Sequence, residues 1–119
     1  MSLRVLIADD HGLVRKGLRQ VLAIAPDIEV VGEAAHGQML LERLQTLEVD
    51  VVLLDMGMPG MSGVDLIRKL TEGYPGVATL VVSMHDEGQI VTRAIRAGAA
   101  GYITKDADPE LLVAAIDRK

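Results

Sequence analysis

Short apolar runs alternate with amphipathic stretches along the whole chain, and this alternation limits the fold more than any other feature of the sequence. The apolar runs predict strands near residues 4–8, 28–34, 51–54, 79–83 and 101–104. Between and after these runs, apolar residues recur at helical spacing. A strand–helix unit repeated in this way predicts an α/β fold: one open, five-stranded parallel sheet with right-handed crossovers and helices on both faces. The common closed barrel would need eight such units.

Several of the predicted helices carry local start or stop signals. Ser62 and Asp65 have the spacing of a capping box at the start of the third helix. Asp108 is placed to cap the last helix, with Pro109 at its first position. Gly98 follows the fourth helix, where a left-handed residue often ends a helix. These signals support the same division of the chain.

Length and composition suit a single parallel α/β domain over residues 1–119. Half of the residues are apolar but only 2% are aromatic, so aliphatic side chains and methionine must build the core. Buried parallel sheets have such cores. A chain of 119 residues is long enough for one domain and too short for two.

Charge and residue usage exclude several classes of function. The net charge of −5 argues against a nucleic-acid-binding surface, which would be basic. Because the chain has no cysteine, it can form no disulfide, thiolate zinc site or cysteine nucleophile. No apolar run approaches the roughly 20 residues of a membrane span, and no secretory signal is visible at the N-terminus. We therefore expect a soluble, cytoplasmic protein with no membrane contact.

Polar side chains follow four of the apolar runs, at the point where each predicted strand ends. They are Asp9 and Asp10, Asp55, Ser83 and Lys105. The carboxyl ends of parallel strands lie at one edge of a sheet, so these side chains should converge on one pocket. Three crowded carboxylates repel one another, which makes a cation the natural guest. The chemistry that this set suggests is metal-assisted phosphoryl transfer.

Each of these residues also has an ordinary structural role when it is considered alone. Asp9 and Asp10 could cap the following helix, and Asp55 could be a turn residue at a strand end. Lys105 could be a surface lysine, and Ser83 a capping hydroxyl. The functional interpretation depends on all of them occurring together, in order, at the ends of strands.

The motifs around these residues resemble one known family. The segments ADDH, LLDMGMPGMSG, VVSMH and GYITKD are similar to the receiver domain of two-component response regulators, and the resemblance spans nearly all 119 residues. The ADDH opening, the LVRKGLRQVL helix and the ending AAGYITKDADPELL resemble the NarL/FixJ branch. The resemblance implies a three-layer flavodoxin-like (CheY-like) fold with strand order 2-1-3-4-5.

The resemblance also implies roles for the clustered residues. Asp55 would be the phosphoacceptor, taking a phosphoryl group from a sensor histidine kinase. Asp10, Asp55 and the backbone carbonyl of Gly57 would bind Mg²⁺ directly, and Asp9 would bind it through water. The metal and Lys105 would offset charge on the phosphoryl oxygens. The protein would then catalyse only its own phosphorylation and dephosphorylation, which is not enzyme activity in the usual sense.

By the same resemblance, Ser83 and Tyr102 match the residues that switch the conformation. The Ser83 hydroxyl would bond the new phosphoryl group, and the Tyr102 ring would turn into the space that it leaves. Tyr102 could also be an ordinary strand tyrosine. Switching would reshape the face made by the fourth helix, fifth strand and fifth helix, and it could join two receivers in a homodimer. Contact with DNA is expected only through a C-terminal helix-turn-helix domain absent from this chain.

A few positions depart from the family pattern or vary within it. Asp106 stands where many receivers have a proline after a cis peptide bond. Gly57 and His85 border the expected phosphoryl site, where Gly57 leaves room for an attacking water. His85 either screens that water or is a solvated loop residue. His11 and His36 show no spacing typical of a transition-metal site.

Three other functions have the same architecture or cluster. A Mg²⁺-dependent phosphatase with an aspartyl nucleophile generally has a second acid two residues later, where this chain has Gly57. A flavin- or nucleotide-binding domain needs a phosphate loop rich in Gly, Ser and Thr after the first strand, and ADDHGLVRKG is instead acidic there. A pseudo-receiver that only binds partners would not need the chemical residues, all of which are present.

Overall fold

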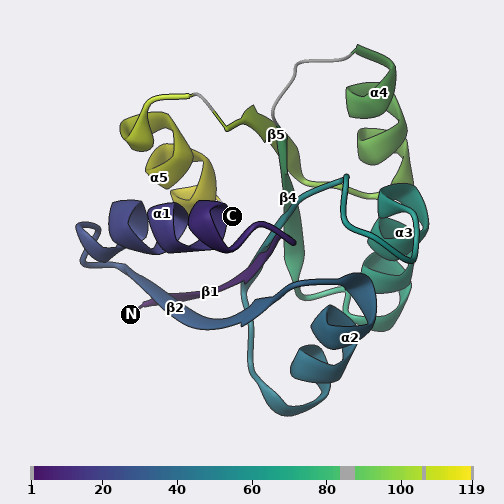
Figure 1. The fold of residues 1–119 in the computed structure, drawn as a ribbon, viewed down its shortest axis with the longest axis horizontal. Helices are drawn as coiled ribbons and strands as arrows, with labels where there is room; N and C mark the ends of the chain where they lie inside the picture. Colours follow the sequence, from purple (N-terminus) through teal and green to yellow (C-terminus); the bar gives the residue numbers. More distant parts are fainter. Residues whose placement is uncertain (1, 84–87, 106, 119) are drawn as a thin grey trace.

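Five parallel strands and five helices alternate along the chain in the computed structural model, which describes residues 2–83, 88–105 and 107–118. The sheet has the order β2-β1-β3-β4-β5 (Figure 1), as expected from the sequence. The strands are β1 (Leu3–Ala8), β2 (Ile28–Ala34), β3 (Val51–Leu54), β4 (Ala78–Ser83) and β5 (Gly101–Thr104). The helices are α1 (Gly12–Ala23), α2 (Gly37–Thr46), α3 (Gly63–Gly73), α4 (Gly88–Ala97) and α5 (Pro109–Asp117).

Helices cover both faces of the sheet. Figure 1 shows α1 and α5 on one side and α2, α3 and α4 on the other. Successive strand residues point to opposite faces, so Leu6 and Ala8 of β1 pack with α2, α3 and α4. Val5 and Ile7 of the same strand pack with α1 and α5. This burial on both faces explains why the strands are continuous apolar runs rather than alternating ones.

The predicted strand boundaries are close to the observed ones. β2, β3 and β5 have the expected limits, whereas β1 and β4 each begin one residue earlier than expected. Backbone pairing extends both strands, because Leu3 pairs with Ile28 and Ala78 pairs with Val51. Neighbouring strands therefore set where these two begin.

Two of the three helix-end signals behave as predicted. The Ser62 hydroxyl accepts a hydrogen bond from the Asp65 amide at 3.2 Å. Gly98 has a φ of +121°, the positive value that favours glycine. Asp108 does precede α5, with Pro109 at its start, but its side chain makes no capping hydrogen bond. The predicted start of the last helix is therefore correct, but the expected hydrogen bond to the Asp108 side chain is not formed.

The carboxyl ends of the central strands lie level with one another. Ala8 at the end of β1 pairs with Leu54 at the end of β3, and Ser83 at the end of β4 pairs with Thr104 at the end of β5. The residues that follow these pairs therefore emerge at the same edge of the sheet. That edge is where the sequence places the polar cluster.

Candidate functional site

Backbone hydrogen bonds extend the strand ladders as far as the clustered residues. The Asp55 amide donates to the Ala8 carbonyl at 2.9 Å, and the Asp9 amide donates to the Ala34 carbonyl at 3.0 Å. The Lys105 amide donates to the Ser83 carbonyl at 2.6 Å. The sheet thus fixes the starting point of each of these side chains.

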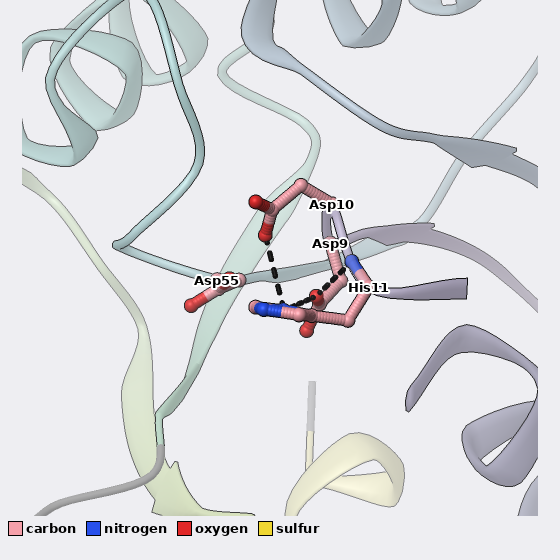
Figure 2. Close-up of side chains that lie close together, drawn as sticks. All are labelled: Asp9, Asp10, His11 and Asp55. Carbon is pink, nitrogen blue, oxygen red and sulfur yellow. Dashed lines mark hydrogen bonds and ion pairs between the residues drawn. The ribbon is translucent and has the colours of Figure 1, made fainter. Parts of the chain in front are cut away.

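Three carboxylates meet at this edge of the sheet, as expected. Asp9 and Asp55 come from neighbouring strands and are 2% and 8% exposed, whereas Asp10 is exposed. Ligand atoms of Asp9, Asp10, His11 and Asp55 all lie within 4.8 Å of one another (Figure 2). Side chains separated by more than forty residues of sequence therefore form one acidic cluster.

The Lys105 ammonium lies between two of the carboxylates. Its Nζ atom is 2.8 Å from Oδ2 of Asp9 and 3.7 Å from Oδ1 of Asp55. The Lys105 side chain is only 9% exposed, so this is not a solvated surface lysine. The closer partner is Asp9, although the sequence associates Lys105 with the expected phosphoryl site on Asp55.

His11 is part of the cluster, and the sequence prediction missed it. Its backbone amide donates to Oδ1 of Asp9 at 2.9 Å. Its ring Nδ1 lies 3.0 Å from Oδ1 of Asp9 and 3.1 Å from Oδ1 of Asp10. Figure 2 shows the ring projecting beneath Asp10 toward Asp55. The only signal in the sequence was that His11 directly follows the two acids, at the turn where the chain reverses from β1 into α1.

Burial and charge move the pKa values of the two buried acids in opposite directions. Burial raises the pKa of Asp55, the nearby carboxylates of Asp9 and Asp10 raise it further, and these effects outweigh the Gly57 amide and the Lys105 charge. Burial alone would also raise the pKa of Asp9. Hydrogen bonds from Lys105 and His11 outweigh that effect and lower it. Of these two buried acids, Asp55 is therefore the one whose charged form its surroundings disfavour.

A surface cavity of about 340 Å³ opens beside Asp55. It is lined by His11, Asp55, Met56, Gly57, Ser83, Ile90 and Lys105. Ser83, at the end of β4, therefore shares one cavity with the carboxylate and the ammonium, as the sequence predicts. The cavity gives solvent and small molecules access to Asp55.

Gly57 keeps the space over Asp55 open. Its amide donates to Oδ1 of Asp55 at 3.1 Å, which holds the loop against the carboxylate. A Cβ atom at residue 57 would lie 3.7 Å and 3.9 Å from the two Asp55 oxygens. A larger residue at this position would therefore overhang the carboxylate.

Tyr102 occupies a different environment from the clustered residues. It is half-buried in β5 and packs against the core on the side of α2, α3 and α4. It is not among the described residues that line the cavity. Tyr102 pairs with Val81 and Thr104 pairs with Ser83, so Tyr102 and Ser83 share a face on adjacent strands.

Two other expectations fall on residues that the structure does not describe. The predictions about His85 and about the Lys105–Asp106 peptide bond both lie outside the described residues. Among the helices in the described part of the chain, none combines the length and the hydropathy needed to cross a bilayer.

The residues present fit a divalent cation. The cluster offers carboxylate oxygens from Asp9, Asp10 and Asp55, the ligand type that Mg²⁺ prefers. The raised pKa of Asp55 has the same implication, because a nearby cation would favour its charged form. The Lys105 ammonium adds a positive charge 3.7 Å from Asp55, so the cluster has the groups that a carboxylate nucleophile would need.

Comparisons with known proteins show the family to which this chain belongs. The family model of the response regulator receiver domain matches residues 5–117. The nitrate/nitrite response regulator protein NarL of Escherichia coli K12 is 40% identical over 112 residues, which cover 94% of this chain and 52% of NarL. This chain spans about half the length of the curated relatives that it matches.

Solved structures show the same fold over almost the whole chain. A LuxR-family two-component response regulator from Aurantimonas sp. SI85-9A1 is 32% identical with a TM-score of 0.92, covering 99% of this chain and 84% of that one. The isolated receiver domain of RcsB from Salmonella enterica serovar Typhimurium, solved in the presence of the phosphomimetic BeF₃⁻, is 27% identical with a TM-score of 0.90. That alignment covers 99% of this chain and 90% of the RcsB chain. The chain therefore belongs to the receiver domain family of two-component response regulators, in the NarL and LuxR branch.

Proposed function

We propose that Asp55 is the phosphoacceptor of this receiver domain and that a sensor histidine kinase is its donor. The observation that carries the proposal is the meeting of three carboxylates and one ammonium beside an open cavity at the carboxyl edge of the sheet. Asp55 is the acid that both lines the cavity and lies within 3.7 Å of Lys105. It is therefore the best placed to attack phosphorus.

In the proposed reaction, an Asp55 carboxylate oxygen attacks the phosphorus of a phosphohistidine. The P–O bond forms as the P–N bond breaks, and the released imidazole nitrogen is protonated from solvent. Asp55 has to be ionised to attack. Its raised pKa opposes ionisation, and the Lys105 charge favours it. The chain's contribution is to position the attacking oxygen and to compensate charge.

Asp10 and Asp55 would hold a Mg²⁺ ion directly, with the Gly57 carbonyl as a third ligand and Asp9 acting through water. When bound, the ion supplies positive charge that stabilises the phosphoryl oxygens during transfer. Lys105 supplies a second positive charge from the β5 side. Because its closer partner is Asp9, we expect its ammonium to move toward Asp55 when the phosphoryl group arrives.

Ser83 and Tyr102 would relay the event to the surface. The Ser83 hydroxyl shares the cavity with Asp55, so it is placed to donate a hydrogen bond to a phosphoryl oxygen. Tyr102 lies on the same face of the sheet, one strand away and level with Val81. An inward shift of Ser83 would change the packing around the Tyr102 ring and shift the balance between two states of the face made by α4, β5 and α5.

The switch would act on a partner or on a further domain. One such partner would be a second copy of the receiver, which would form a homodimer when the surface changes on phosphorylation. Contact with DNA would need a helix-turn-helix domain of the kind found in LuxR-type regulators, and the acidic charge of this chain does not suit DNA. As a receiver, the chain would catalyse only its own phosphorylation and dephosphorylation.

Intact mass spectrometry tests the proposal directly. With Mg²⁺ and acetyl phosphate, the chain should gain the mass of one phosphoryl group, and Asp55→Asn should abolish the gain. Asp65→Asn is a matched control, since Asp65 is exposed on α3. Equal uptake by Asp55→Asn and the unsubstituted chain would overturn the assignment of Asp55.

The same experiment separates the alternative functions. Many turnovers of a substrate phosphate, with no stable adduct, would favour the phosphatase. That outcome has little support in the chain, because residue 57 is a glycine and not the second acid such enzymes generally use. No uptake and no Mg²⁺ binding would favour a pseudo-receiver that only binds partners.

A further inference from the structure

One arginine of α1 connects the acidic cluster to the edge strand β2. The Arg15 guanidinium donates from Nη1 to the backbone carbonyl of Asp9 at 2.6 Å. It also donates from Nε to Oε1 of Glu33, in β2, at 2.8 Å. The Arg15 side chain is only 23% exposed, so it is largely shielded from solvent. The proposed reaction gives Arg15 no role, although it contacts the first acid of the cluster.

The carbonyl that Arg15 binds belongs to the peptide bond between Asp9 and Asp10. Both acids follow the last residue of β1, Ala8. The Asp9 amide still donates to a carbonyl of β2, whereas Asp10 is exposed at the turn into α1. A hydrogen bond from a charged donor is short and strong. Arg15 therefore restrains the peptide plane from which Asp10 projects.

An irregularity in β2 turns Glu33 toward this arginine. Leu6 of β1 pairs with Gly32 instead of Val31, which gives β2 one extra residue, a β-bulge. In an uninterrupted register, Glu33 would lie on the sheet face covered by α2, α3 and α4. The bulge places Glu33 opposite Ile7, on the face covered by α1 and α5. The contact of Glu33 with α1 thus depends on the pairing of the sheet.

We propose that Arg15 is a positioning residue for the metal site. Oriented by Glu33, it holds the peptide between Asp9 and Asp10 so that the two carboxylates are in place before a divalent ion binds. Groups that orient metal ligands in this way typically contribute about 10- to 100-fold in metal affinity. This inference rests on the proposed function, because Asp9 and Asp10 are the acids assigned there to Mg²⁺.

The charge of Arg15 and its hydrogen bond have opposite effects on metal binding. As a cation close to the cluster, Arg15 repels a divalent ion, so the loss of its charge alone would strengthen metal binding. The loss of the hydrogen bond to the Asp9 carbonyl would weaken metal binding, because the acids would no longer be held in place. The sign of the change therefore distinguishes positioning from simple electrostatics.

Calorimetric titration of the intact chain with a magnesium salt measures that sign. Arg15→Met, which keeps an unbranched side chain but removes the donors, should weaken Mg²⁺ binding by roughly 10-fold. Arg19→Met is the matched control, because it removes the same charge. Within the described part of the chain, Arg19 pairs with Glu33 and not with Asp9, and its side chain is 45% exposed. This control should change the affinity by less than about twofold.

Amide ¹⁵N relaxation of the metal-free chain in EDTA tests the positioning without any metal. The Asp10 amide belongs to the same peptide unit as the Asp9 carbonyl. Arg15→Met should therefore increase the fast motion of that amide, whereas Arg19→Met should leave it unchanged. Glu33→Ala should cause a smaller increase, because it removes the group that orients Arg15. This variant keeps the inference testable if Arg15→Met does not fold.

The inference is overturned if Arg15→Met folds and binds Mg²⁺ at least as tightly as the unsubstituted chain. It is also overturned if Glu33→Ala leaves the motion of the Asp10 amide unchanged.

Asp10→Asn separates this inference from the proposed function. It should weaken Mg²⁺ binding, because it removes a proposed direct ligand. If Asp10→Asn weakens Mg²⁺ binding and Arg15→Met does not, only the inference is rejected. If both Asp10→Asn and Asp55→Asn bind Mg²⁺ and take up a phosphoryl group as the unsubstituted chain does, the proposed site itself is rejected.

Discussion

At the scale of single residues, Asp55 is a buried acid whose surroundings oppose its charge. Burial, Asp9 and Asp10 together raise its pKa above the ordinary value. A carboxyl group whose folded pKa is raised binds more protons in the folded state than in the unfolded state. The stability that depends on this group is therefore fully present below its unfolded pKa and falls as the pH rises through its folded pKa.

Asp55→Asn should therefore stabilise the metal-free protein at neutral pH. We expect the free energy of unfolding in EDTA to rise by roughly 1 kcal/mol, a usual size for a single substitution. The gain should shrink as the pH falls toward the range where the Asp55 carboxyl is protonated, because a neutral carboxyl resembles an amide. Urea denaturation of both chains between about pH 4 and pH 8 measures this difference. A gain that does not depend on pH would show that the Asp55 charge is not its cause.

Asp9 has the opposite dependence on pH, because its hydrogen bonds to Lys105 and His11 lower its pKa despite burial. Its contribution to stability should be present above its unfolded pKa and lost as the pH falls through the lower, folded value. Lys105→Met removes the 2.8 Å contact and leaves a buried carboxylate with one partner fewer. We expect it to cost roughly 1–3 kcal/mol of unfolding free energy at neutral pH.

A double-mutant cycle checks the source of that cost. If the pair acts as a unit, Lys105→Met should cost much less in the Asp9→Asn background than in the unsubstituted chain. Fully additive effects would mean that Lys105 stabilises the fold through other contacts, such as its 3.7 Å approach to Asp55.

At the scale of elements, the turn between α4 and β5 depends on a glycine. Gly98 has a φ of +121°, and a Cβ atom there would lie 2.2 Å from the Thr71 hydroxyl of α3. Thr71 cannot easily move away, because that hydroxyl donates to the carbonyls of Ile67 at 2.9 Å and Ala97 at 3.4 Å. A residue with a Cβ atom at position 98 would therefore have both an unfavourable φ and a clash with Thr71.

Gly98→Ala should therefore lower the free energy of unfolding by about 1–3 kcal/mol, the cost of a residue held in a rarely populated conformation. Gly73→Ala is the matched control, because a Cβ atom at the end of α3 meets nothing within 4 Å. Thermal unfolding of both variants measures the contrast. Similar melting temperatures for the two would contradict the account of this turn.

The elements also show which features the sequence could predict. The apolar runs and the helical spacing predicted every strand, because a parallel sheet buried on both faces requires continuous apolar strands. They also predicted that Asp9, Asp55 and Lys105 lie at one edge of the sheet, since the carboxyl ends of parallel strands lie together. The predicted starts of β1 and β4 were each one residue too late, because pairing with the neighbouring strands extends both strands.

The sequence could not predict which partner a given side chain contacts. It grouped Lys105 with the carboxylates but did not indicate that the closer partner is Asp9. It gave His11 no role, because the contact of its ring with two acids depends on the turn from β1 into α1. The missing capping bond of Asp108 is a similar case, since position alone does not fix a side-chain rotamer.

At the scale of the whole molecule, the proposed site has to communicate with the face made by α4, β5 and α5. Tyr102 packs into the core on the side of α2, α3 and α4 and shares a face with Ser83, so the sheet itself connects the cavity to that side. We expect Tyr102→Ala to leave acetyl phosphate uptake intact and to weaken the effect of phosphorylation on dimerisation. Tyr102→Phe, which keeps the ring, should retain that effect.

Sedimentation of the phosphorylated and unphosphorylated forms at matched concentrations measures this response. A phosphorylation-dependent change in Tyr102→Ala that equals that of the unsubstituted chain would remove Tyr102 from the switch.

We propose that residues from the ends of β1, β3 and β5 form one metal-dependent phosphoryl site with Asp55 as the attacking group. A crystal structure of the chain with Mg²⁺ and beryllofluoride tests it most directly. We predict beryllofluoride on an Asp55 carboxylate oxygen, Mg²⁺ in contact with Asp10 and Asp55, and Lys105 turned from Asp9 toward the fluorines. Beryllofluoride bound elsewhere, or a metal ion that touches neither Asp10 nor Asp55, would contradict the account.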